Sequence, residues 1–216
     1  KRAENNVALI LVTSDRGLCG AYNTNLFKKV EAYFRENQDK KISLFCIGKK
    51  GNDFFKHRNY DIRYYSPSDN KIMTLDKVNE LVDKMINEYT NTFFDKVLIV
   101  FSKFVSVMNQ IPTERPLLPV EKIEEKEDRR VDYIFEPGAQ SLLEKLFPKY
   151  LENQLYNAIV ESYASELAAR LVSMKNATKS AGEMIDSLTL TYNKARQAGI
   201  TKEILEIISG AEALKG

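Results

Sequence analysis

Histidine, cysteine and tryptophan are scarce in this chain of 216 residues, which has one His, two Cys and no Trp. Two cysteines give no disulfide framework and fit a reducing compartment. The single histidine, His57, leaves too few ligands for a zinc site, and we expect neither a metal nor another cofactor. The longest apolar runs are far shorter than the roughly 20 residues that a membrane helix needs, so we expect no direct membrane span.

An excess of charge of one sign is also lacking. The 32 Lys and Arg residues face 30 Asp and Glu residues, which leaves a formal net charge of +2. This balance does not suit a protein that neutralises many phosphates, so we expect no nucleic-acid partner. Hydrophobic residues make up 44% and charged residues 29% of the chain, which excludes a disordered or fibrous protein.

The first part of the chain alternates apolar, β-rich runs with stretches of helical spacing. Continuous apolar runs of this kind are typical of strands buried on both faces of a parallel sheet. We therefore predict an α/β domain over residues 1–137, with a mostly parallel sheet and flanking helices, similar to a Rossmann fold. The expected strands are 7–13, 41–48 and 96–102, and the expected helices contain 26–34 and 75–86.

Shorter segments complete this domain. Residues 61–66 can supply an edge strand, and 103–120 alternate apolar and polar residues before Pro112, Pro116 and Pro119. Because proline is tolerated at sheet edges, we expect an antiparallel edge strand or hairpin there. The last segments are predicted as a solvated, mixed-charge loop at 121–130 and a short strand at 131–135.

Residues 138–216 predict one very long helix. Ser141 and Glu144 form a possible capping box, and Pro148 is expected to end or kink the first helical segment. No proline lies between Lys149 and Ser209. About 60 helical residues span about 90 Å, too long to lie inside the preceding domain.

Steps of four and three residues from Leu167 follow one apolar stripe along this helix, with the 3.5-residue period of a coiled coil. We call this stripe the seam. It comprises Leu167, Leu171, Met174, Ala181, Ile185, Leu188, Tyr192 and Ala195. A narrow apolar stripe needs a second long helix to cover it, and this sequence contains none. The partner is therefore another copy, another protein, or a segment that this sequence lacks. Beyond Gly199 the apolar surface widens, which indicates that protein surrounds the end of the helix.

The loop Ser14–Asn25 lies where a strand gives way to a helix, which is where α/β sheets commonly bind ligands. Asn23 or Thr24 as N-cap could help hold a phosphate, and Cys19 beside Arg16 could act as an activated thiol. The loop matches neither the P-loop nor the dinucleotide-binding pattern, and His57 belongs to an unrelated segment. An enzyme that uses this loop for a phosphorylated ligand is thus one alternative, and a self-associating coiled-coil scaffold is another. Cys46, inside an apolar strand, is expected to be a core residue.

Three segments carry a resemblance to a known family. VALILVTSDRGLCGAYNTNLFK at 7–28 closely resembles the opening of the globular part of the γ subunit of F-type ATP synthases. YNKARQAGITKEILEIISGAEAL at 192–214 resembles that family's carboxyl-terminal signature, and ENQLYNAIVESYASELAARLVSMKNAT at 152–178 fits its middle. One departure is Ala21-Tyr22, where the family more often has Gly-Leu, and we expect it to alter local packing only.

The resemblance implies a central stalk, or rotor, in the F1 part of a proton-translocating ATP synthase. Such a subunit couples rotation of the membrane ring to ATP synthesis or hydrolysis at the β subunits and has no catalytic residues of its own. Its implied partners are the α, β and ε subunits and the membrane c-ring. Its implied place is the cytoplasmic face of the bacterial inner membrane, as a peripheral subunit, and the less favoured alternative is the matrix side of the mitochondrial membrane.

The resemblance also assigns contacts. Family members begin with a long helix, absent from this sequence, that pairs antiparallel with the carboxyl-terminal helix and covers the seam. The positions matching β-subunit contacts are Arg196, Gln197, Thr201 and Glu203. The positions resembling contacts with the membrane ring or the ε subunit are Asp132, Phe135 and Glu136.

Overall fold

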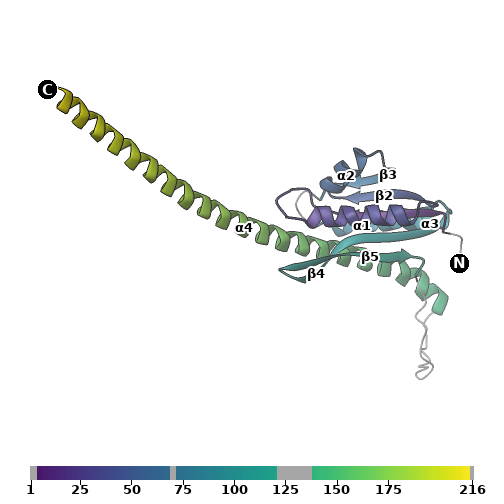
Figure 1. Ribbon diagram of the computed structural model, residues 1–216. Helices are drawn as coiled ribbons and strands as arrows, with labels where there is room; N and C mark the ends of the chain where they lie inside the picture. The colour runs from purple at the N-terminus through teal and green to yellow at the C-terminus, as the bar shows by residue number, and fades with distance from the viewer. Residues whose placement is uncertain (1–3, 69–71, 121–137, 215–216) are drawn as a thin grey trace, which may run out of the picture. The chain divides into compact units, whose positions relative to one another are not determined.

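The computed structural model describes residues 4–68, 72–120 and 138–214 (Figure 1). By its internal contacts the chain forms two compact units, Lys1–Val172 and Ser173–Gly216. The first eight elements belong to the first unit, and the ninth, α4, begins there and continues through the second. In chain order the elements are β1 (Asn6–Val12), α1 (Tyr22–Glu36), β2 (Lys41–Ile47), α2 (Lys49–Lys56), β3 (Ile62–Ser66), α3 (Leu75–Thr90), β4 (Lys96–Ser106), β5 (Asn109–Leu118) and α4 (Ala139–Ala213).

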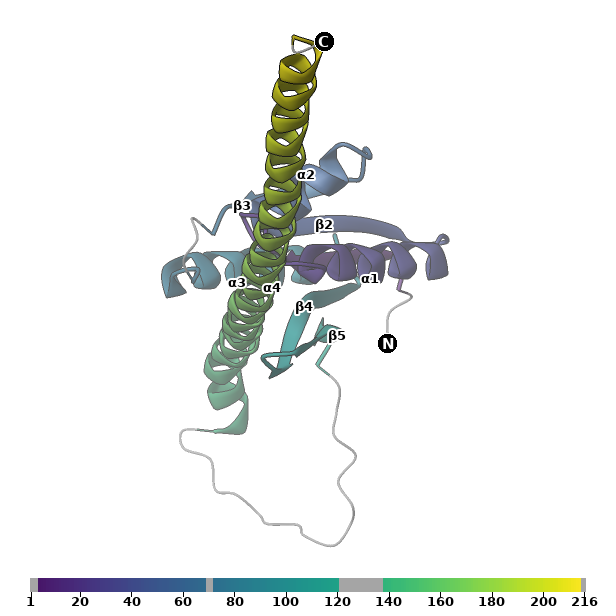
Figure 2. The same ribbon diagram turned by 60° about the vertical axis from the view of Figure 1, so that its left-hand side comes forward.

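The strands form one sheet in the order β3-β2-β1-β4-β5. β1 runs parallel to β2 and β4, β3 runs parallel to β2, and only β5 is antiparallel. β3 and β5 are thus the two edge strands, and the β4–β5 hairpin is seen below β2 in Figure 2. These findings confirm the predicted α/β fold, the edge strand in 61–66 and the antiparallel hairpin. Pro112 and Pro116 lie on the edge strand β5, where a missing N–H is tolerated.

Side chains of successive strand residues point to opposite faces of the sheet. Both faces of this sheet are buried, because an apolar cluster lies on each. Val7, Leu9 and Leu11 of β1 pack in one apolar cluster with α1 and α2. Ala8, Ile10 and Val12 pack in a second cluster with α3 and the first part of α4. This two-sided burial explains why the run VALILV contains no polar residue.

The helices of the sheet follow the predicted apolar spacing. In α1, Leu26 and Val30 are fully buried, and in α3 the buried residues are Val78, Leu81, Val82 and Met85. Leu75 begins α3 and is exposed. The short helix α2 ends at Lys56, and His57 is its C-cap.

The long helix α4 differs from the prediction at its start. It begins at Ala139, so Ser141 is inside the helix and is no N-cap. Pro148 also lies inside α4 and does not end it. Proline leaves the carbonyl of Glu144 without its helical donor, but Glu144 is exposed and water can satisfy that group. Downstream, buried Leu151 and Leu155 hold the helix on the sheet.

Three predictions concern residues outside the described ranges, namely the loop at 121–130, the strand at 131–135 and the domain boundary at 137. They stay predictions. Within the described ranges, no helix combines the length and the apolar character needed to cross a membrane.

Candidate functional site

The loop between β1 and α1 lies at the carboxyl edge of the parallel strands, and its polar side chains bind one another. Ser14 Oγ donates to the carbonyl of Arg16 at 2.7 Å, and Asn23 Nδ2 donates to Ser14 Oγ at 2.7 Å. Asn23 Oδ1 accepts from the Ser14 amide at 3.2 Å. The prediction that Asn23 or Thr24 caps α1 is therefore wrong: Ala21 is the N-cap, and no side chain caps the helix.

Cys19 is a buried side chain and no exposed nucleophile. It is 2% exposed, and Asn23 Nδ2 donates to its sulfur at 3.3 Å. His57 is exposed at the end of α2. No group of three or more metal-ligating side chains exists among the described residues. The loop thus lacks the base that an activated thiol needs, which argues against the enzyme alternative.

The carboxyl edge is covered by α4. β1 pairs with β4 only as far as Leu11 and Val100, and β4 continues beyond that point. There the Ser102 amide donates to Ser162 Oγ at 3.3 Å, and Ser165 Oγ donates to the Ser102 carbonyl at 2.9 Å. Two serines of α4 therefore satisfy the strand groups of Ser102 where the β1 ladder has ended. The crevice where an open α/β sheet would bind a ligand is filled by this helix.

Tyr22, the first residue of α1, reaches the same serine from another element. Its hydroxyl donates to the Ser162 carbonyl at 3.0 Å and lies 2.7 Å from Ser162 Oγ. Burial raises the pKa of the Tyr22 phenol, so the hydroxyl stays protonated and able to donate. The departure at Ala21-Tyr22 thus supplies a hydroxyl that bonds a residue 140 positions away in the sequence.

A cavity of about 20 Å³ remains beside this contact, lined among others by Thr13, Tyr22 and Glu166. That volume holds about one water molecule and no nucleotide. Glu166 is 8% exposed, and Arg170 Nη2 donates to its Oε1 at 2.6 Å. Burial raises the pKa of Glu166, an effect that the bond and charge of Arg170 oppose.

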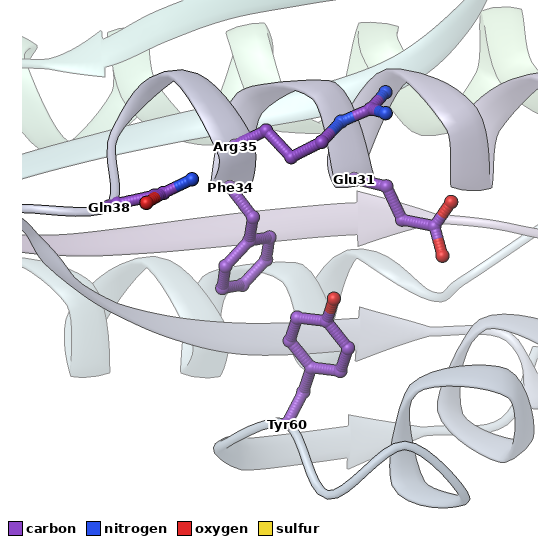
Figure 3. A pocket seen from close by; sticks show the side chains of 5 residues that line it. All are labelled: Glu31, Phe34, Arg35, Gln38 and Tyr60. Carbon is purple, nitrogen blue, oxygen red and sulfur yellow. The ribbon is translucent and has the colours of Figure 1, made fainter.

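An open pocket of about 430 Å³ lies at the other end of α1 (Figure 3). Phe34 and Tyr60 meet there edge to face, with ring centroids 4.6 Å apart, and Glu31, Arg35 and Gln38 complete the lining. Tyr60 precedes β3, so this pocket lies at the amino ends of the strands. It offers an aromatic pair and a few charges but no nucleophile.

The predicted seam is exposed over both units of the chain. Its large residues Leu171, Ile185 and Leu188 are 60%, 63% and 62% exposed. The seam residues are all exposed side chains of α4, and they are Leu167, Leu171, Met174, Ala181, Ile185, Leu188, Tyr192 and Ala195. An apolar stripe of this length in water is typical of a surface that another helix covers.

The predicted β-subunit contacts lie close together near the end of α4. Arg196 and Glu203, seven residues apart, share one side of the helix, and Gln197 and Thr201, four apart, share another. All four are exposed, and Thr201 Oγ1 donates back to the Gln197 carbonyl at 2.9 Å. Between these two polar sides runs a stripe of exposed isoleucines, Ile200, Ile204 and Ile207.

The apolar face of α4 therefore changes position at Gly199. The four-and-three steps of the seam continue from Gly199 to Lys202 and Glu206, which are charged. The isoleucine stripe lies on a different side of the same helix. Two distinct surfaces follow one another along α4. The predicted ring or ε contacts Asp132, Phe135 and Glu136 lie outside the described residues.

Comparisons with known proteins agree on one class. The family model described as ATP synthase matches residues 1–214. The ATP synthase gamma chain of Pelotomaculum thermopropionicum is 44% identical over 215 residues, which cover 99% of this chain and 75% of that protein. The corresponding chain of Bdellovibrio bacteriovorus is 39% identical over 226 residues, with 100% and 77% covered.

A solved structure shows the same fold. A chain of the mitochondrial ATP synthase of Euglena gracilis, from a structure of its OSCP, F1 and c-ring, matches with a TM-score of 0.70 and 21% identity. The match covers 98% of this chain and 73% of that one. The α/β domain followed by a long terminal helix is thus the fold that this chain shares with a subunit of an ATP synthase. The chain belongs to the family of ATP synthase gamma chains.

Membership confirms the predicted family and the prediction that the chain is a non-catalytic subunit of a rotary ATP synthase. It also makes the chain part of a peripheral, membrane-associated complex. Sequence reasoning missed the contact of Tyr22, Ser102, Ser162 and Ser165. Its signal was present: serines replace apolar residues on the buried face of α4, which otherwise continues from Leu155 through Ile159.

Proposed function

We propose that this subunit is the rotor that couples rotation of the proton-driven membrane ring to ATP synthesis and hydrolysis at the β subunits. The observation that carries the proposal is α4: one helix begins on the α/β domain and continues through two successive exposed apolar surfaces. A helix held at one end in a packed domain can transmit torque because its packed turns resist twisting together. The chain supplies no catalytic residue in this mechanism.

The seam is the surface for a second helix. In the proposed assembly, the long amino-terminal helix of the family lies antiparallel on it. Small side chains at Ala181 and Ala195 let the two backbones approach. Leu171, Ile185 and Leu188 supply the apolar contact.

The end of α4 is the surface for the catalytic subunits. Arg196 and Glu203 flank the isoleucine stripe on one side, and Gln197 and Thr201 flank it on the other. These side chains suit reversible contacts with the β subunits, because hydrogen bonds to charged groups are strong and directional. The isoleucines suit a surrounding sleeve of α and β subunits.

The contacts with the membrane ring or the ε subunit are proposed from the family resemblance alone. Asp132, Phe135 and Glu136 are assigned to the membrane c-ring or the ε subunit. With these partners the subunit acts at the cytoplasmic face of the bacterial inner membrane.

The test is assembly of a rotating complex. The chain is produced with the family's amino-terminal helix restored, mixed with α and β subunits, and observed as single molecules with a bead on the α/β domain. We expect ATP-driven rotation, and its loss when Ile185 and Leu188 of the seam are both changed to Asp. The exposed pair Lys179→Ala and Glu183→Ala, off the seam, is the matched control.

Two results contradict the proposal. One is an assembled complex that hydrolyses ATP without rotating. The other is sedimentation of the chain with its restored helix as a stable dimer, which would favour the coiled-coil scaffold.

A further inference from the structure

The contact between α4 and the sheet is mostly apolar but contains one group of hydrogen-bonded serines. Leu151, Leu155, Ala158 and Ile159 of α4 pack into the apolar cluster under the sheet. One and two turns later, Ser162 and Ser165 are fully buried at 0% exposure. Both hydroxyls are bonded to the same residue of β4, Ser102.

Apolar packing and hydrogen bonding restrain a helix differently. Burial of apolar area is non-directional, so a helix held only by such contacts can shift or turn slightly at small cost. A hydrogen bond weakens steeply with angle and distance. If α4 turned about its axis, both Ser102 backbone groups would lose their partners at once. Because the β1 ladder has ended at Val100, no strand residue could replace them.

Tyr22 adds a third direction of restraint. It belongs to α1, which packs on the face of the sheet opposite to α3. Its hydroxyl holds the Ser162 carbonyl, so α4 is bonded both to β4 and to α1. A helix tied to two separate elements cannot rotate or slide without breaking one of the ties.

We propose that Tyr22, Ser102, Ser162 and Ser165 form the joint that fixes the rotational position of α4 on the α/β domain, so that torque passes between them without slip. The inference rests on the proposed rotor function and adds the positioning residues for it. α4 continues as one helix to Ala213.

The experiment uses the complete complex, with the amino-terminal helix restored and the membrane ring present in sealed vesicles. ATP hydrolysis and ATP-driven proton pumping are measured together for Ser162→Ala with Ser165→Ala, and separately for Tyr22→Phe. Ser43→Ala is the matched control, since it removes one buried serine bond of 2.6 Å to Asp61, far in sequence from α4.

We expect the joint variants to hydrolyse ATP while the protons pumped per ATP fall about twofold or more, because slip wastes rotation. The control should keep the ratio of the unchanged complex. Ser162→Ala with Ser165→Thr, which retains the hydroxyl at position 165, should restore coupling relative to Ser162→Ala with Ser165→Ala. A purely structural role would lower the amount of assembled complex and leave the ratio unchanged.

The outcomes separate the two proposals. If the unchanged complex shows no coupling of pumping to hydrolysis, the rotor function is wrong. If it couples and the joint variants couple equally well, only the joint is overturned. Should the double serine variant fail to assemble, Tyr22→Phe decides, because it keeps the buried ring and removes one hydroxyl. An unchanged ratio in Tyr22→Phe would then overturn the joint.

Discussion

Gly48 lies directly against Thr13: a Cβ atom at position 48 would stand 2.1 Å from the Thr13 carbonyl oxygen. Gly48 also has φ of 97°, in the region that favours glycine, and forms the N-cap of α2. The close approach brings the end of β2 against the end of β1, where the Thr13 amide donates to the Ile47 carbonyl at 2.8 Å.

Gly48→Ala should therefore destabilise the domain strongly. Backbone strain and the contact with Thr13 together predict a loss of about 3 kcal/mol or more in the free energy of unfolding. Urea denaturation followed by circular dichroism measures it. Gly17→Ala is the control, because nothing lies within 4 Å of a Cβ there. Equal stability of the two variants would contradict the prediction.

Leu155→Ala should loosen α4 from the sheet. Leu155 is fully buried in the cluster with α3, and removal of such a side chain costs about 2–5 kcal/mol. Leu190→Ala, at a residue of α4 that is 57% exposed, should change stability by less than about 0.5 kcal/mol. Hydrogen exchange of the segment around 151–166 should rise in the first variant only. Similar exchange in both would show that this face does not hold the helix.

Glu166 should make stability depend on pH. Burial raises the pKa of its carboxyl above the ordinary value of 4.5, so the folded state holds the proton more tightly than the unfolded chain. This contribution is fully present below pH 4.5 and is lost as pH rises through the folded pKa. Against Glu166→Gln, which cannot ionise, the unchanged chain should thus lose relative stability from about pH 4.5 upward.

Unfolding in urea at a series of pH values measures that difference. The other carboxylates are shared by both chains, so they cancel in the comparison. A relative stability that instead grows with pH would mean that the bond with Arg170 outweighs burial.

Both thiols should be inert in the folded protein. Cys19 and Cys46 are buried, and burial raises the pKa of the Cys46 thiol to about 12, which leaves almost no thiolate at pH 8. Alkylation by iodoacetamide should become fast only in denaturant. Cys19→Ala and Cys46→Ala separate the two thiols by mass spectrometry. Rapid labelling of the native chain at Cys46 would contradict this prediction.

The sheet and the long helix could be predicted from sequence because their signals are local. Val7 to Val12 are apolar without interruption, which only two-sided burial explains. The heptad spacing from Leu167 identified a helix without reference to any partner. The hairpin followed from prolines that a central strand would not accept.

Contacts between distant segments could not be predicted in the same way. Ser102 and Ser165 are 63 positions apart. The sequence around either residue does not indicate that the two form a hydrogen bond. Asn23 was predicted as a helix cap because its side chain suits that role. In the structure this side chain instead bonds the amide and the hydroxyl of Ser14. Pro148 was expected to end or kink the first helical segment, and it does not end it, because α4 continues through Pro148 to Ala213.

The prolines of β5 have a consequence for assembly. β5 is the outermost strand of the sheet, and neither Pro112 nor Pro116 has an N–H to offer to a further strand. Open strand edges are where sheets of separate molecules join and aggregate. This edge therefore resists pairing with the strands of other molecules. The subunit is therefore less prone to aggregate through this edge of its sheet.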